Sequence, residues 1–581
     1  MTAVQTIWAR LIATTLADAG VRLCVISPGS RSTPLVAALA RTRLELVTII
    51  DERAAAFYAL GAARATNEPT AVVCTSGSAT AHYLPAIVEA ATAHVPLIAL
   101  TANRPPELHD CGASQTIDQR ALYGGFVRGS FDLGAPVASE LALRAVHRKV
   151  VRAITLALGP DPGPVHIDVP LRKPLEPAAP AGDAERALAR TAAELAARPA
   201  VIAPPSLAPD RSAIAALSEI IASEPRGVIV AGAMPVSFGA ARDVVFELAS
   251  RSGYPIVAEA GSQLRFGPRP PEVAFVDRFD VIPGDRLPEP AVIVQFGAES
   301  VAANWPEFAR RSARSHAARW VLSGTSWHDP DSAADGVILG DVAAVVAALA
   351  AKPRVHRATA WRDRWRKADD HAAAAVERAL AAHPRSEACI VRAAIAAMPA
   401  DALVQIGNSL PIRVLDQVCS SGAPRMVITQ RGAAGIDGMI ASAAGATRAR
   451  RPVLLIVGDV SFAHDLGGLL AARAVEAPLA ILVIDNAGGR IFAGLPIGRA
   501  DLGPAFGRHW LTAPEIDPAA IATALGARAI TAGSSAAAAA SAVAIALATP
   551  GSTIIHAPVA ASGAHDVRRT ALQLHANGGP S

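Results

Sequence analysis

The sequence predicts an α/β protein made of three doubly wound domains with mostly parallel sheets. Two observations favour this fold class. Short β-branched and leucine-rich runs alternate with helical patterns along almost the whole chain, and many of these runs end abruptly at a small or polar residue. Such alternation is typical of parallel strands joined by crossover helices. The chain of 581 residues is too long for a single hydrophobic core, so several domains are expected.

The first domain is predicted over residues 1–180. We expect its strands at RLCVISPG, ELVTII, TAVVCTSG and PLIALTA, with helices between them and a closing strand near GPVHIDVPLRKPL. An amphipathic helix ending at Gly20 is predicted for the opening segment, MTAVQTIWARLIATTLADAG. This segment lacks the basic start and the long apolar core of a signal peptide.

The second and third domains are predicted over residues 181–352 and 353–581. An Ala- and Pro-rich stretch at 176–206 is predicted to be a linker, and the next boundary is expected around AAKPRVHRATA. The alanine-rich stretch SSAAAAASAVAIALA predicts a buried helix and not a membrane span. The expected strands are RGVIVAGA, PIVAEA, AVIVQFGA and RWVLSG in the second domain, and ALVQIGNS, RMVITQRG, PVLLIVGD, LAILVIDN and STIIHAPV in the third.

The amino-acid composition argues against nucleic-acid binding and against an oxidising compartment. The formal net charge is only +4, and the scattered Lys and Arg residues have no aromatic residues between them, so nucleic-acid binding is not expected. The five cysteines are far apart and form no CxxC pair, which indicates a reducing compartment without structural disulfides or zinc. We therefore expect a cytoplasmic protein.

Two polar side chains follow predicted strands of the third domain. Asp459 comes directly after PVLLIVG, and Asn486 ends the run ILVIDN, a spacing suited to one strand-helix-strand crossover. A carboxylate, an amide oxygen and the Gly488 carbonyl form a ligand set suited to Mg²⁺ that also binds phosphates. A helix starting near His464–Asp465 is expected to point its N-terminus toward the same phosphates. Gly-Asp alone is a common turn dipeptide, but the pair at this spacing favours a metal-diphosphate site.

This pair resembles the thiamin-diphosphate signature, with Val460 where a glycine is usual. Further motifs are similar to those of the 2-succinyl-5-enolpyruvyl-6-hydroxy-3-cyclohexene-1-carboxylate synthase (MenD) family. They occur in the expected order in the first and third domains, whereas the middle domain is similar only in general character. These motifs are SPGSRSTPL, IDERAAAFYALG, TSGSATA, TANRPPEL, SQTIDQ, GNSLPIR, RGAAGIDG and DNAGGRIF.

The resemblance implies the thiamin-diphosphate-enzyme architecture and a transferase activity. The implied domains are a pyrimidine-binding domain, a central α/β domain and a diphosphate-binding domain, in chain order. The implied cofactors are thiamin diphosphate and Mg²⁺ or Mn²⁺. The implied reaction decarboxylates 2-oxoglutarate and adds the succinic semialdehyde carbanion 1,4 to isochorismate, as a step of menaquinone biosynthesis. A homodimer or tetramer with active sites between subunits is also implied.

The resemblance also implies the cofactor site. Glu52 takes the role of the catalytic glutamate that shares a proton with the aminopyrimidine ring, and Ile436 that of the bulky residue that bends the cofactor. The implied metal ligands are Asp459, Asn486 and Gly488. The implied cofactor-binding residues are Glu52, Ser409, Ile436, Gly458, Asp459, Val460, Ser461, Asn486, Gly488, Ile491 and Phe492.

The two implied substrates carry several carboxylates, which call for arginines and hydroxyls on loops. Arg31 and Arg104 follow strands of the first domain, and Arg413 and Arg431 belong to the third. The residues implied to bind substrate are Ser30, Arg31, Ser32, Arg104, Ser114, Gln115, Asn408, Ser409, Arg413, Arg431, Phe492 and Leu495.

Departures from the family pattern leave the acceptor specificity open. Ser114, Gln430 and Ala487 each stand where the family commonly has Asn. One alternative is another thiamin-diphosphate-dependent carboligase or decarboxylase with a different acceptor. A nicotinamide or flavin oxidoreductase requires a GxGxxG turn, and the nearest stretch, VIVAGAMPVSFGAAR, lacks that spacing. A non-catalytic scaffold predicts loss of Glu52 or Asp459, and both are present.

Overall fold

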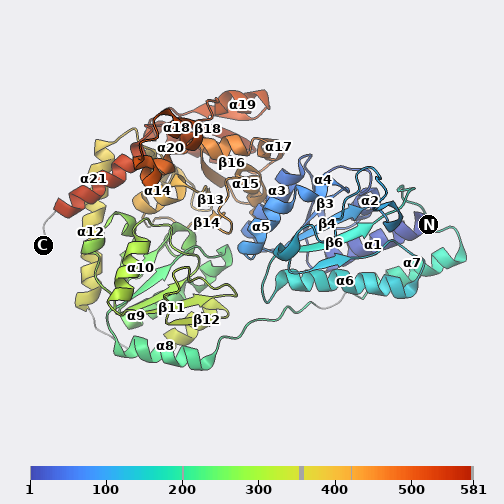
Figure 1. Cartoon of the computed structure of the whole chain (residues 1–581), viewed down its shortest axis with the longest axis horizontal. Helices are drawn as coiled ribbons and strands as arrows, with labels where there is room; N and C mark the ends of the chain where they lie inside the picture. The colour runs from blue at the N-terminus through green and yellow to red at the C-terminus, as the bar shows by residue number, and fades with distance from the viewer. Residues whose placement is uncertain (1, 199–201, 353–358, 421, 578–581) are drawn as a thin grey trace. The chain divides into compact units, whose positions relative to one another are not determined.

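The computed structural model describes residues 2–198, 202–352, 359–420 and 422–577 (Figure 1). Within these ranges the strands form three six-stranded sheets. Every pairing between neighbouring strands is parallel, as the alternating pattern predicts. The chain divides into two compact units: unit 1 contains Met1–Pro205, Gly432–Ala449 and Asp465–Ala474, and unit 2 contains Ser206–Arg431, Arg450–His464 and Val475–Ser581.

Unit 1 contains the first sheet, in the order β2-β1-β3-β4-β6-β5. Its helices form two layers, in which α1 packs on α2, α6 and α7 while α3 packs on α5 and α15 (Figure 1). The strands are β1 (Leu23–Ile26), β2 (Glu45–Thr48), β3 (Thr70–Cys74), β4 (Leu97–Asn103), β5 (Ser130–Asp132) and β6 (Val165–Pro170). The helices are α1 (Thr2–Asp18), α2 (Thr33–Leu39), α3 (Glu52–Thr66), α4 (Ser78–Ala81), α5 (Leu84–Thr92), α6 (Glu140–Leu158), α7 (Asp183–Ala196), α15 (Met439–Ala446) and α17 (Gly468–Arg473).

Unit 2 contains the other two sheets, in the orders β12-β11-β10-β7-β8-β9 and β14-β13-β15-β16-β18-β17. The strands are β7 (Gly227–Ala231), β8 (Ile256–Ala258), β9 (Phe275–Val276), β10 (Val292–Phe296), β11 (Ala318–Ser323), β12 (Gly336–Leu339), β13 (Leu403–Ile406), β14 (Met426–Thr429), β15 (Val453–Gly458), β16 (Leu479–Asp485), β17 (Arg528–Thr531) and β18 (Ser552–Pro558). The helices are α8 (Arg211–Ser223), α9 (Arg242–Ser252), α10 (Trp305–Arg314), α11 (Val342–Ala350), α12 (Thr359–Ala382), α13 (Glu387–Ala397), α14 (Leu410–Val418), α16 (Asp459–His464), α18 (Pro504–Phe506), α19 (Pro518–Ala524), α20 (Ala536–Leu547) and α21 (Gly563–Asn577).

The first and third sheets share one topology. In each, the second strand lies on one side of the first strand and the third strand lies on the other, so the strand order reverses between strands one and three. A reversal of this kind predicts a crevice at the carboxyl ends of β1 and β3, and a second one at the carboxyl ends of β13 and β15. Ligands of open α/β sheets bind at such crevices. The shared order agrees with a duplication of one ancestral domain.

Three expectations about local structure need correction. The opening helix α1 is not amphipathic: of its residues 3–18, only Arg10 is exposed, because α2, α6 and α7 all pack against it. The predicted linker at 176–206 contains helix α7, whose Leu188 and Ala192 join the core of the first sheet. The helix expected to start near His464–Asp465 is displaced: α16 covers Asp459–His464, and after a turn α17 begins at Gly468.

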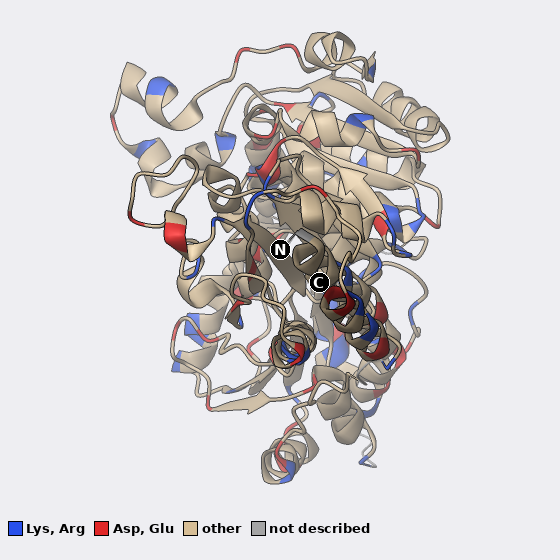
Figure 2. Cartoon of the chain, turned by 90° about the vertical axis from the view of Figure 1, so that its right-hand side faces the viewer, with Lys and Arg blue, Asp and Glu red and all other residues tan. Residues whose placement is uncertain are grey.

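The domain boundaries at 180 and 352 stay predictions. The second one borders residues 353–358, which lie outside the described part of the chain, as do residues 199–201 of the expected linker. The alanine-rich helix α20 buries one face, with Ala539, Ala542 and Val543 in the core. None of the helices in the described ranges combines the length and the apolar character needed to cross a membrane. Figure 2 shows basic and acidic residues interspersed along the chain, in agreement with its small net charge.

Candidate active site

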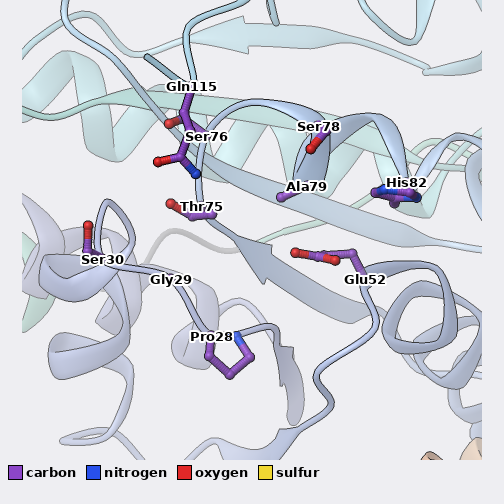
Figure 3. Close-up of a pocket in the computed structure, with 10 residues that line it drawn as sticks. All are labelled: Pro28, Gly29, Ser30, Glu52, Thr75, Ser76, Ser78, Ala79, His82 and Gln115. Atoms are coloured by element: carbon purple, nitrogen blue, oxygen red, sulfur yellow. The ribbon is translucent and has the colours of Figure 1, made fainter.

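The crevice of unit 1 contains a cavity of about 310 Å³. Segments that follow β1, β2 and β3 form its wall, which is where the reversal of strand order predicts a ligand site. Figure 3 shows the Glu52 side chain pointing across the cavity toward the segment that follows β3. The lining residues are Pro28, Gly29, Ser30, Glu52, Thr75, Ser76, Ser78, Ala79, His82 and Gln115.

Glu52 is the first residue of α3. The helix is capped by its neighbour Asp51, whose side chain accepts hydrogen bonds from the backbone N–H groups of Arg53 (2.9 Å) and Ala54 (3.2 Å). Because Asp51 satisfies these donors, the Glu52 carboxylate is not needed as a cap and faces the cavity. An acidic group held in this way is available for proton transfer to a ligand.

A buried polar network supports the loop after β3. Asp168 on β6 accepts hydrogen bonds from the Thr101 hydroxyl (2.7 Å), the Asn103 amide (2.6 Å) and the Gln119 amide (3.0 Å). The Gln119 side-chain oxygen in turn accepts a hydrogen bond from the backbone N–H of Gly77 (3.0 Å), next to the cavity. Burial raises the pKa of Asp168 to about 6. The network thus anchors the cavity wall to β4 and β6.

The structure brings only some of the predicted substrate residues of unit 1 together. Ser30 and Gln115 line the cavity with Glu52, and the Arg104 guanidinium donates a hydrogen bond to the Gln115 side-chain oxygen (3.3 Å). Ser114 is exposed on the same loop. Two other predicted residues bind the protein itself: the buried Arg31 donates to the Leu171 carbonyl (2.6 Å), and the Ser32 hydroxyl donates to the Gly29 carbonyl (2.9 Å).

Two buried carboxylates fix the ends of the loop that contains Ile436. Glu89 accepts hydrogen bonds from the backbone N–H groups of Gly432 (3.0 Å) and Ala433 (2.6 Å). Asp465 accepts from the N–H groups at the start of α15, with 2.7 Å to Ile440. The predicted bending residue therefore lies between two anchored points.

The crevice of unit 2 contains the predicted metal ligands. Asp459 directly follows β15 and is buried; its carboxylate accepts hydrogen bonds from the backbone N–H groups of Val460 (2.9 Å) and Gly488 (2.6 Å). Burial raises the pKa of Asp459. Asn486 follows β16 and is also buried, and its Oδ1 has no hydrogen-bond partner among the described residues. A buried carboxylate beside an unsatisfied amide oxygen fits a bound divalent cation, because oxygen atoms are its preferred ligands.

Sequence reasoning missed a second buried acid at this crevice, beside Asp459. Glu387, the first residue of α13, accepts a hydrogen bond from the Asn486 Nδ2 (2.8 Å). Burial, with a smaller contribution from the charge of Asp459, raises the pKa of Glu387 to about 7. An acidic residue in a helix's first turn usually stabilises the helix dipole at the surface, so the sequence carries no signal of this contact.

The arginines predicted to bind the oxoacid lie close to each other. Arg413 on α14 donates a hydrogen bond to the Ser409 carbonyl (2.6 Å), and the Asn408 amide donates to the Gln430 carbonyl (2.8 Å). Burial lowers the pKa of Arg413, and the nearby charge of Arg431 lowers it further. Two repelling cations at a sheet edge favour a bound anion.

The other predicted cofactor residues differ in exposure. Ser461 on α16 is buried, Gly458 and Val460 are half-buried, and Ile491 packs against the core of unit 2. Phe492 is half-buried, whereas Leu495 is exposed. The roles of all these residues stay predictions.

Comparisons with known proteins agree with this geometry. Residues 8–122 match the N-terminal TPP binding domain of thiamine pyrophosphate enzymes, and residues 411–557 match the C-terminal TPP binding domain. The fold is similar to that of benzoylformate decarboxylase from Polynucleobacter necessarius, with a TM-score of 0.71 and 16% identity over 97% of this chain and 99% of that one. The two domain matches, together with the fold, identify a thiamin-diphosphate-dependent enzyme.

Relatives with similar sequences show to which family of this superfamily the chain belongs. The chain is 43% identical to the 2-succinyl-5-enolpyruvyl-6-hydroxy-3-cyclohexene-1-carboxylate synthase of Sorangium cellulosum, over 85% of this chain and 83% of the relative. It is 42% identical to the synthase of the same name from Roseiflexus sp., over 86% and 87% of the two chains. The chain belongs to the family of these synthases.

Proposed function

We propose that this chain catalyses the reaction of the synthases to which it is similar. In this reaction 2-oxoglutarate loses CO₂ and the remaining four-carbon unit adds 1,4 to isochorismate, which gives 2-succinyl-5-enolpyruvyl-6-hydroxy-3-cyclohexene-1-carboxylate for menaquinone biosynthesis. The observation that carries the proposal is the donor set of Asp459 and Asn486 at the crevice of the third sheet, where the buried Asn486 oxygen has no partner in the described chain.

The donor set supports a Mg²⁺ or Mn²⁺ ion that holds a diphosphate. Asp459, the Asn486 Oδ1 and the Gly488 carbonyl would supply hard oxygen ligands and leave other positions for phosphate oxygens and water. Gly458, Val460, Ser461, Ser409 and Ile491 would line the diphosphate and thiazolium region. When bound, thiamin diphosphate supplies a carbanion at its thiazolium ring and an electron sink for decarboxylation.

The chain's own residues would move one proton and bind anions. The Glu52 carboxyl would exchange a proton with the aminopyrimidine ring, and Ile436 would hold the cofactor in its bent conformation. Arg413 and Arg431, with Asn408 and Ser409, would bind the carboxylates of 2-oxoglutarate. Phe492 and Leu495 would exclude water from the reacting carbon. Ser30, Arg31, Ser32, Arg104, Ser114 and Gln115 would bind isochorismate.

Two further expectations belong to the same proposal. We expect a homodimer or tetramer whose active sites form between subunits, as the family resemblance implies. All five cysteines are free thiols; Cys111 is exposed and Cys389 is half-buried. Free, accessible thiols support a reducing, cytoplasmic location.

The test is a turnover assay with four components. The purified protein is incubated with thiamin diphosphate, Mg²⁺, 2-oxoglutarate and isochorismate, and the loss of isochorismate absorbance is followed. We expect turnover to require all four components and to fall by roughly 10²–10⁴ in the Glu52→Gln variant. Release of CO₂ from 2-oxoglutarate while isochorismate stays intact would point instead to a carboligase with another acceptor. No reaction with any 2-oxoacid would refute the proposal.

A further inference from the structure

Glu387 is a buried carboxylate that the proposed function does not use. It is 1% exposed and lies at the start of α13, a helix that Ser386 caps by accepting a hydrogen bond from the Cys389 N–H. One of its oxygens, Oε2, accepts from the Asn486 Nδ2 at 2.8 Å across 99 positions of the sequence. The other, Oε1, has no hydrogen-bond partner among the described residues. A buried acid with one partner needs an explanation beyond fold stability.

The chemistry of the two groups fixes the orientation of the amide. An amide has a donor end and an acceptor end, whereas an ionised carboxylate, the form that a nearby cation favours, only accepts hydrogen bonds. The Asn486 Nδ2 must therefore face Glu387, and its Oδ1 must face away from Glu387. That oxygen is buried without a partner in the described chain, so it is available as a ligand. Without Glu387, either end of the amide could face the predicted cation, and the NH₂ end would repel it.

We propose that Glu387 is a positioning residue that holds the Asn486 oxygen toward the divalent cation and adds a negative charge behind this ligand. The inference rests on the proposed metal role of Asn486. Partners that orient metal ligands in this way typically contribute 10-fold to 100-fold to metal affinity.

The test measures Mn²⁺ binding directly. Free Mn²⁺ is titrated by electron paramagnetic resonance in the presence of excess thiamin diphosphate, with the full chain. For Glu387→Leu we expect Mn²⁺ affinity to fall by roughly 10-fold to 100-fold. For Glu387→Gln we expect a smaller loss of several-fold, because the Gln side-chain oxygen still accepts from the Asn486 Nδ2 while the charge is gone.

Ser386→Ala is the matched control. It removes the cap of the same helix but leaves the contact between Glu387 and Asn486 unchanged. We expect this variant to unfold at a lower temperature than the native protein and to bind Mn²⁺ with unchanged affinity. An equal loss of Mn²⁺ affinity in Ser386→Ala and Glu387→Leu would overturn the inference, because the effect would then come from the helix.

Asn486→Ala separates this inference from the proposed function. If Asn486→Ala weakens Mn²⁺ binding and Glu387→Leu does not, Glu387 has no positioning role and the metal site itself stands. If the native protein takes up no Mn²⁺, or if Asn486→Ala binds it normally, the proposed metal site fails and the inference fails with it. Should Glu387→Leu not fold, Glu387→Gln decides, and unchanged Mn²⁺ affinity in that variant overturns the inference.

Discussion

Replacing Gly61 by alanine should destabilise unit 1, although alanine is the better helix former. Gly61 lies in α3, and a Cβ atom there would overlap the Ser442 carbonyl oxygen of α15 and lie 2.6 Å from its carbonyl carbon. Gly445 of α15 meets α3 in the same way, with a Cβ position 2.7 Å from the Tyr58 carbonyl carbon. Both clashes are with backbone, so no side-chain rotation relieves them.

The magnitude follows from two opposing terms. Gly→Ala inside a helix gains about 1 kcal/mol. An ordinary Cβ contact needs 3.4 Å or more, and the overlap with the carbonyl oxygen is the larger one, so the two helices must separate by more than about 1 Å. Forcing such a separation in a packed core costs about 1–3 kcal/mol, and the upper end applies because backbone opposes backbone. We expect a net loss of about 2 kcal/mol, and a lower melting temperature by roughly 4–8 °C for a cooperative unit of this size.

Thermal unfolding with a matched control tests this reasoning. Gly239→Ala serves as the control, because a Cβ there meets nothing within 4 Å, and its stability should change by less than about 0.5 kcal/mol. The double variant Gly61→Ala, Gly445→Ala should lose less than the sum of the single losses, because one separation of the helices relieves both clashes. A Gly61→Ala protein that is more stable than the native one would refute the close packing of α3 on α15.

Three further predictions concern acidic residues. Asp459→Asn should weaken Mg²⁺-dependent binding of thiamin diphosphate by roughly 100-fold or more in calorimetric titrations, since it removes the ligand charge; unchanged binding would place the metal elsewhere. The pKa of Asp168 is raised to about 6 in the native state. The native state therefore binds more protons than the unfolded state above pH 3.8, and the free energy of unfolding falls as the pH rises through 6. The advantage of the native protein over Asp168→Asn in urea unfolding should therefore shrink by about 2 kcal/mol between pH 4.5 and 7.5; His166, with a pKa lowered to about 4, affects both proteins alike. Glu89→Gln should lower the free energy of unfolding by about 3 kcal/mol, because it leaves the buried Arg64 guanidinium without its carboxylate partner. It should also weaken cofactor binding in a fluorescence titration. Equal melting temperatures of the variant and the native protein would contradict this.

The buried central strands could be predicted from the sequence, whereas four of the six edge strands could not. Central strands such as β15 and β16 are apolar runs buried on both faces, which gives a strong local signal. The strands that the sequence did not reveal, β5, β9, β12 and β17, all lie at sheet edges. They contain two to four residues each, and most of their side chains are exposed or half-buried, so their apolar signal is short or interrupted.

Some residues of the candidate site could likewise be predicted from the sequence, and others could not. Glu52, Asp459 and Asn486 were detectable because each follows an apolar strand, a pattern that local sequence preserves. Glu387 and Glu89 were not, because their partners lie 99 and 343 positions away or more. A buried acid within a helix has no periodic signature of its own, and only the packed fold shows what it contacts.

In the central sheet, the loops at the topological switch point contact each other. Its strand order also reverses, between β7 and β10, and the stretch nearest to a dinucleotide-binding turn, VIVAGAMPVSFGAAR, starts within β7. In the first sheet the corresponding loops leave the Glu52 cavity between them. In the central sheet the loops touch: the Ala298 N–H donates a hydrogen bond to the Ala233 carbonyl (3.0 Å), and a Cβ at Gly232 would lie 2.8 Å from the Ala298 carbonyl carbon. Backbone therefore fills the place where a pyrophosphate would bind, which argues against an oxidoreductase independently of the missing glycine spacing. At the switch point, a cavity thus separates the two loops of the first sheet, whereas the two loops of the central sheet are in direct contact. The difference depends on how closely the loops after the two strands approach each other.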